Sequence, residues 1–113
     1  MSTTVLRDLA RHLLAYKIVI RVEFLGTKIR AYIIHGYMLD VYYNQTTHKY
    51  SYTVVKKGRR ILGWDNAKHH VQLETFPHHY HSKSGDIVKS QLRGIPIKDL
   101  KIVMDTIALE LKL

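Results

Sequence analysis

The sequence has no cysteine and only two prolines among its 113 residues. The lack of cysteine excludes disulfide bonds, thiolate zinc sites and cysteine nucleophiles. No apolar run approaches the about 20 residues that a membrane-spanning helix requires. The first residues also lack the basic start and apolar core of a signal peptide. Together, these absences predict a cytoplasmic protein without a membrane segment.

Acidic residues are scarce as well, with 9 against 18 lysines and arginines, which gives a net charge of +9. The excess lies in residues 1–60, where eleven basic and three acidic side chains give +8. Concentrated positive charge favours a polyanionic partner, either nucleic acid, an anionic membrane surface or an acidic protein. A basic surface that only maintains solubility is the alternative. Tyrosines interleaved with the basic residues favour nucleic acid as the partner.

The periodicity of apolar residues predicts two helices that flank a sheet. Apolar residues recur at helical spacing over residues 4–16 and again from Leu100 to the C-terminus. Between these segments the period changes to two, which is typical of half-buried strands. Five such runs, separated by short turns, predict an antiparallel meander. They cover residues 18–24, 29–34, 37–43, 50–55 and 60–65, and in the last run Arg60, Leu62 and Trp64 alternate with Ile61 and Asp65.

Residues 66–85 show no clear period and predict a long loop that could contain one short strand. Residues 86–90 predict a final short strand. We therefore expect a single α+β domain over residues 1–113: an N-terminal helix, a five- to six-stranded antiparallel meander sheet, a histidine-rich loop and a C-terminal helix packed on the sheet. The helices would cover one face and leave the other, with its Tyr and Arg side chains, open. An exposed edge strand would permit a homodimer.

The histidine-rich segment is the main functional feature, since it holds five of the eight histidines. Imidazole exchanges protons near neutral pH, and RNA supplies its own nucleophile in the 2′-hydroxyl. A metal-free ribonuclease then needs one base, one acid and a cation for the developing charge. We expect these roles to fall to the segment, with Asp65 orienting one imidazole. The histidines are His69, His70, His78, His79 and His81.

Residues around this segment could bind the RNA itself. Arg59 and Arg60 are predicted to bind phosphate, because two basic pairs lie directly before the segment. Aromatic side chains could stack on bases, although strand tyrosines often only pack across strands. The predicted RNA-binding residues are Lys56, Lys57, Arg59, Arg60, Lys68, Tyr50 and Tyr52.

Two other interpretations of the histidines stay open. If His79 and His81 lie in a strand they point to the same side, and both could bind one divalent metal such as Zn²⁺, with Asp65 or Glu74 as a further ligand. Acid–base chemistry by these histidines requires no cofactor. The alternative to a ribonuclease is a non-catalytic basic module that binds nucleic acid or metal. The imidazoles could also serve only to satisfy loop backbone groups.

Three stretches carry a family resemblance: Lys49-Tyr-Ser-Tyr52, then Asp-Asn-Ala-Lys-His-His at 65–70, then Thr-Phe-Pro-His-His-Tyr-His at 75–81. They resemble the TumE-like family of small toxins, found in bacterial and archaeal toxin–antitoxin pairs. The family pattern has a Tyr-x-Tyr strand, an Asp-Asn-Ala-Pro-His-His turn and a Phe-Pro-His-His-x-His signature. A Val-x-Ser element, matched by Val88 to Ser90, and a C-terminal helix follow. The resemblance covers about residues 20–113 and implies a toxin with an antitoxin partner.

The chain departs from the family pattern at two positions. Gly63 stands where family members usually carry Arg, two residues before the Asp, and Lys68 stands where they usually carry Pro. If that Arg binds phosphate in the family, the resemblance implies either that Arg60 or Lys68 replaces it here or that activity is weakened in this chain.

Overall fold

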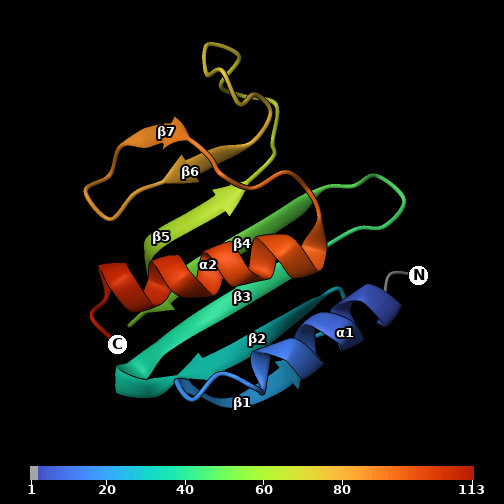
Figure 1. Cartoon of the computed structure of the whole chain (residues 1–113), viewed down its shortest axis with the longest axis vertical. Coiled ribbons are helices and arrows are strands. Elements are labelled where there is room, and N and C mark those ends of the chain that lie inside the picture. The colour runs from blue at the N-terminus through green and yellow to red at the C-terminus, as the bar shows by residue number, and fades with distance from the viewer. Residues whose placement is uncertain (1–2) are drawn as a thin grey trace.

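The computed structural model describes residues 3–113 and confirms the predicted α+β class, with one helix at each end of an antiparallel sheet (Figure 1). Helix α1 (Thr3–Leu13) ends three residues before its predicted end. A short 3₁₀ turn (Ile34–Gly36) separates the second and third strands. None of the described helices is long and apolar enough to span a membrane. The remaining elements are β1 (Val19–Phe24), β2 (Lys28–Ile33), β3 (Tyr37–Tyr43), β4 (Tyr50–Lys56), β5 (Arg59–Asp65), β6 (His79–His81), β7 (Ile87–Lys89) and α2 (Pro96–Glu110).

All seven strands form one sheet in chain order, from β1 at one edge to β7 at the other. Each strand pairs antiparallel with the next, as the short turns predicted. The sheet has more strands than the five to six expected. Strand β6 lies inside the segment predicted as a loop that could contain one short strand. Three residues such as His79–His81 are too few to show a period, so pairing with β5 and β7 defines this strand.

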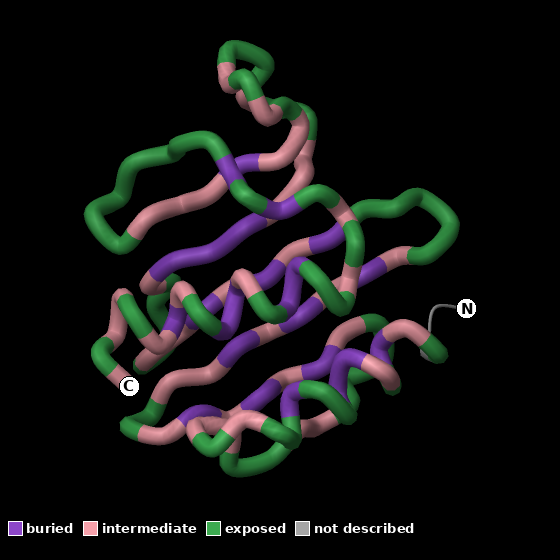
Figure 2. Tube along the Cα trace, viewed as in Figure 1, coloured by how far each residue is buried: buried purple, intermediate pink, exposed green. Residues whose placement is uncertain are grey.

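Both helices lie over the same face of the sheet (Figure 1), and buried residues are concentrated between the two layers (Figure 2). Every second strand residue points into this layer, so Leu39, Tyr52 and Val54 are at most 1% exposed. The helices contribute Leu6, Leu9, Leu13, Leu100, Val103, Met104 and Ile107. The opposite face, called the open face below, is not covered by either helix.

A β-bulge in β5 changes the direction of one basic side chain. Val54 of β4 pairs with Leu62, but the adjacent Val55 pairs with Arg60, so Ile61 is an extra residue in β5. Simple alternation places Arg60 on the same face as Leu62, which is buried. The bulge instead turns Arg60 to the open face.

Candidate functional site

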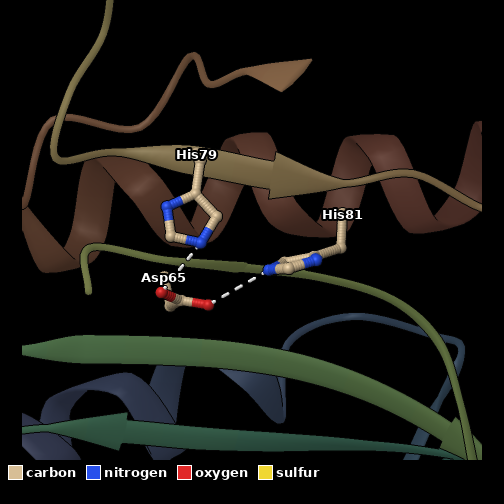
Figure 3. A group of neighbouring side chains, drawn as sticks. All are labelled: Asp65, His79 and His81. Carbon is tan, nitrogen blue, oxygen red and sulfur yellow. Dashed lines mark ion pairs between the residues drawn. The ribbon is translucent and has the colours of Figure 1, made fainter. Parts of the chain in front are cut away.

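The open face of β5 and β6 carries the centre of the site. Asp65 ends β5 and pairs with His79 at the start of β6, while Gly63 pairs with His81. Asp65, His79 and His81 therefore share one face, and the intervening Trp64 and Tyr80 face the helices, with ring centroids 4.9 Å apart. Figure 3 shows both imidazoles reaching from β6 toward the carboxylate of Asp65.

Asp65 contacts both histidines at once. Its Oδ1 lies 3.0 Å from Nε2 of His79, and its Oδ2 lies 3.4 Å from Nε2 of His81. Oδ1 also accepts a hydrogen bond of 2.9 Å from the backbone N–H of Ala67, which begins the turn after β5. The carboxylate is thus held by its own turn and has one oxygen directed at each imidazole.

His79 has an acceptor at each ring nitrogen. Its side chain is 2% exposed, and its Nδ1 lies 3.1 Å from the carbonyl oxygen of Pro77, while Nε2 faces Asp65. A carbonyl and a carboxylate only accept hydrogen bonds, so both contacts are hydrogen bonds only when both nitrogens carry protons. A metal ion at Nε2 would take the place of one of these protons.

His81 is partly buried and lies beside Arg60. Burial, and then the positive charge of Arg60, lower the pKa of His81 below its ordinary value. Asp65 opposes this effect through its charge and its hydrogen bond, but the net direction is downward. His81 is therefore mainly neutral at neutral pH, with a lone pair available to accept a proton.

Two further histidines reach this centre from the loop at residues 66–78. The ring centroid of His70 lies 4.7 Å from that of His79 and 6.3 Å from that of His81. His69 is one step further out, 6.2 Å from His70. Four of the five predicted histidines thus gather on the open face, in or beside one cleft of about 780 Å³. Its lining includes Asp65, Lys68, His69, His70, Pro77, His79 and His81.

Asn66 fixes the walls of this cleft. Its Oδ1 accepts a hydrogen bond of 3.0 Å from the backbone N–H of Tyr50, and its Nδ2 donates one of 2.9 Å to the carbonyl of His48. The amide side chain therefore ties the β3–β4 loop to the segment that follows β5. The sequence signal for this role was available, since Asn66 lies inside the Asp-Asn-Ala element, but its partners are 16 and 18 residues away.

The predicted phosphate-binding residues are divided between two places. Arg60 and Lys68 line the histidine cleft, together with Lys49, which sequence reasoning missed. Lys56, Lys57 and Arg59 do not line this cleft. They line a second cavity at the end of the sheet, and Arg60 borders both cavities.

His78, directly before β6, does not join the site, because its ring packs against buried Tyr50 on the helix-covered face. Its Nδ1 and the hydroxyl oxygen of Tyr50 form a hydrogen bond of 2.8 Å, and the two rings stack with centroids 5.8 Å apart. Burial, and then the nearby charge of Arg93, lower the pKa of His78. The structure therefore gives no support to an acid–base or ligand role for His78, whose ring lies away from the other four histidines.

The two predicted base-stacking tyrosines are also inside the core. Tyr50 is 3% exposed and Tyr52 is 1% exposed, and burial raises the pKa of both hydroxyls above the ordinary value. Neither ring offers a face to a base, so the structure gives no support to base stacking by these two tyrosines. Alternation showed that the two rings share a face, but the face is the one that the helices cover.

Within residues 3–113, one group of side chains has the geometry of a metal site: Asp65, His79 and His81. Each offers one ligand atom, and these atoms all lie within 4.8 Å of one another. Two imidazoles and one carboxylate suit Zn²⁺, Mn²⁺ or Fe²⁺. The hydrogen bond from Nδ1 of His79 to Pro77 is the kind of outer contact that orients a ligating histidine. The donor set therefore fits a divalent cation, while Glu74 pairs with Lys89 instead.

Comparison with known proteins supports the resemblance that the histidine motifs suggested. A family model described as Toxin TumE matches residues 4–111, nearly the whole chain. No curated protein and no solved structure matches. The match includes α1 as well as the sheet and α2, so the first helix is part of the family pattern. The chain belongs to the TumE family of toxins from toxin–antitoxin systems, and this membership implies an antitoxin partner.

Proposed function

We propose that this toxin is an endoribonuclease that cleaves RNA through the 2′-hydroxyl, with histidines of the open-face cleft as acid and base. The observation that carries the proposal is the convergence of His70, His79, His81 and Asp65 in one cleft that Arg60 also lines. Such a reaction needs a proton acceptor, a proton donor and a cation within reach of one phosphate.

The geometry supports a division of roles. His81, with its lowered pKa and partial exposure, takes the proton of the 2′-hydroxyl as that oxygen attacks phosphorus. His70, on the loop side of the cleft, gives a proton to the 5′-oxygen as the phosphorus–oxygen bond breaks. Arg60 balances the charge that develops on the phosphate oxygens. The products are a 2′,3′-cyclic phosphate and a free 5′-hydroxyl.

Asp65 and His79 have positioning roles. Asp65 holds Nε2 of His81 at 3.4 Å, so the other ring nitrogen is available to substrate. His79 is too buried to be the main proton donor, but it fixes Asp65 through its own contact of 3.0 Å. Loss of His79 would release the carboxylate, and the orientation of His81 would be lost with it.

The test is cleavage of an RNA oligonucleotide and of the same oligonucleotide with 2′-deoxyribose at the cleaved position. We expect cleavage of the first only, with cyclic phosphate ends detected by mass spectrometry. His81→Ala and His70→Ala should each lower the cleavage rate by at least about 100-fold, and His79→Ala should lower it strongly as well, because His81 then loses its orientation.

The matched control is His35→Asn, which replaces an exposed histidine outside the cleft and suits the positive φ of 67° at that position. This variant should cleave RNA as the wild type does. Cleavage of the deoxy-substituted strand, or unchanged cleavage by folded His79→Ala protein, would contradict the proposal.

A metal-binding function is the second candidate, favoured by the donor set of Asp65, His79 and His81. A divalent cation there would supply charge for a phosphate oxygen or lower the pKa of a bound water. Protein purified without a metal-affinity column should then contain about one equivalent of Zn²⁺, Mn²⁺ or Fe²⁺ by elemental analysis, and Asp65→Ala should lose it. Metal-free protein with full activity would exclude this candidate.

A further inference from the structure

A second cavity lies at the end of the sheet, outside the histidine cleft. It has a volume of about 360 Å³ and is lined by Lys56, Lys57, Arg59, Arg60, Ile61 and Lys83, of which five are cationic. The β4–β5 turn and the β6–β7 turn meet there, near the last turn of α2 (Figure 1). Nζ of Lys83 donates a hydrogen bond of 2.9 Å to the carbonyl of Glu110, so the second turn is anchored to that helix. We call this cavity the basic pocket.

The charges of the basic pocket lack carboxylate partners. Among residues 3–113, none of its five cationic side chains forms an ion pair with Asp or Glu. Elsewhere on the sheet, by contrast, Lys28 and Arg30 both pair with Asp40, at 3.1 and 2.7 Å. Uncompensated cations around a concave surface attract and hold a polyanion.

Arg60 connects the basic pocket to the histidine cleft. It lines both cavities, and the β-bulge places it on the open face beside His81. A Cβ atom at Gly63 would lie 2.9 Å from the carbonyl oxygen of Tyr52 and 3.8 Å from Cδ of Arg60. A side chain at residue 63 would therefore clash with the backbone of β4, whereas Cδ of Arg60 would lie at ordinary contact distance. Gly63 pairs with His81, so Arg60 lies close to the strand position that carries this histidine.

We propose that the basic pocket binds a second phosphate of the same RNA strand, next to the phosphate that is cleaved. This inference rests on the proposed function and names its substrate class: a polynucleotide strand that spans both cavities, rather than a dinucleotide or a free nucleotide. Arg60 lies between the two phosphates, and Lys57 and Arg59 hold the outer one.

The experiment compares substrates of two lengths. A dinucleotide with one phosphate occupies the cleft alone, whereas a hexanucleotide also reaches the basic pocket. The pocket variant is Lys57→Asn combined with Arg59→Gln, and asparagine suits the positive φ of 52° at residue 57. The control is Arg7→Gln combined with Lys98→Gln, which removes two charges from exposed positions on the helices.

We expect the ratio of kcat/KM for the hexanucleotide to that for the dinucleotide to fall about tenfold in the pocket variant, since charged contacts are lost. The ratio should not change in the control. The dependence of hexanucleotide binding on salt should also become shallower by about one unit of slope for each lost contact. An unchanged ratio in a folded pocket variant would overturn the inference.

Binding separates this inference from the proposed function. Oligonucleotides with 2′-O-methyl groups lack the attacking hydroxyl, so their binding by fluorescence anisotropy does not depend on cleavage. Wild-type protein should bind the hexamer more tightly than the dimer, and the pocket variant should lose that difference even if no RNA is cleaved. If the length dependence persists while binding to the antitoxin weakens, the basic pocket is an antitoxin contact and the inference is wrong.

Discussion

His78 and His79 are neighbours in the chain but lie on opposite faces of the sheet, in very different surroundings. On the helix-covered face, the ring of His78 forms a hydrogen bond with the hydroxyl of Tyr50 and packs against that ring. On the open face, His79 shares the carboxylate of Asp65 with His81 and borders a cleft. Polar groups on the covered face serve the fold, whereas those on the open face are arranged around solvent-accessible space.

Two aspartates show the same contrast. Asp99 is 2% exposed and accepts backbone hydrogen bonds of 3.1, 2.8 and 3.2 Å from Arg93, Gly94 and Ile95. It thereby satisfies the chain where it enters α2. Among residues 3–113, Asp65 accepts one backbone hydrogen bond, from Ala67, and its carboxylate also contacts two imidazoles. The carboxylate of Asp99 thus binds backbone donors, whereas that of Asp65 binds the imidazoles of the cleft.

The largest expected effect comes from exchanging these carboxylates for uncharged side chains. Asp99→Ala leaves three backbone donors without a partner, and we expect the free energy of unfolding to fall by about 3 kcal/mol. Asp65→Asn keeps a hydrogen-bonding group beside Ala67 and His79, and we expect a loss of about 1 kcal/mol or less. Urea unfolding of both variants measures the difference. Equal losses of unfolding free energy in the two variants would mean that Asp99 and Asp65 do not differ in their contribution to stability.

A smaller effect on stability distinguishes His78, on the covered face, from His81, on the open face. His78→Asn deprives the Tyr50 hydroxyl of its partner and should lower the free energy of unfolding by about 1–2 kcal/mol, with RNA cleavage retained. His81→Asn should do the reverse, with stability changed by less than about 0.5 kcal/mol and cleavage lost. Each variant is measured by urea unfolding and by cleavage of the same oligonucleotide. Loss of cleavage in a folded His78→Asn protein would place function on the covered face as well.

Much of this fold could be predicted from the sequence, because the spacing of apolar residues within each segment indicates its secondary structure. Helical spacing in two segments and alternation in five others predicted the helices and the meander. Alternation also placed His79 and His81 on one side of a strand. It could not show which face the helices would cover, so Tyr50 and Tyr52 were assigned to the wrong face. Whether these tyrosines are exposed depends on packing against α1 and α2, and the residue pattern of a single strand does not show which face the helices cover.

The direction of Arg60 depended on pairing between strands. Its position in the sequence placed it with Leu62 and Trp64, and only the shifted register against Val54 and Val55 turns it outward. The contact between Asp65 and two histidines likewise arises from the pairing of β5 with β6, across a loop of 13 residues. Spacing in the sequence suggested that Asp65 would orient one imidazole, while the register brings it to two.

The smallest expected effect is on the pH dependence of stability. The pKa of His78 and that of His81 are lowered in the folded protein, so the unfolded chain binds more protons at pH values just below about 6.5. The free energy of unfolding should therefore fall as the pH drops from about 6.5 toward the folded pKa values, and these two groups add no further loss below them. His78→Asn removes one of the two contributions and should show a shallower fall than wild type, whereas His35→Asn keeps both. Urea unfolding between about pH 7.5 and about pH 5 measures the slopes. Equal slopes for wild type and His78→Asn would mean that the covered histidine does not resist protonation, and its contrast with the open face would then rest on geometry alone.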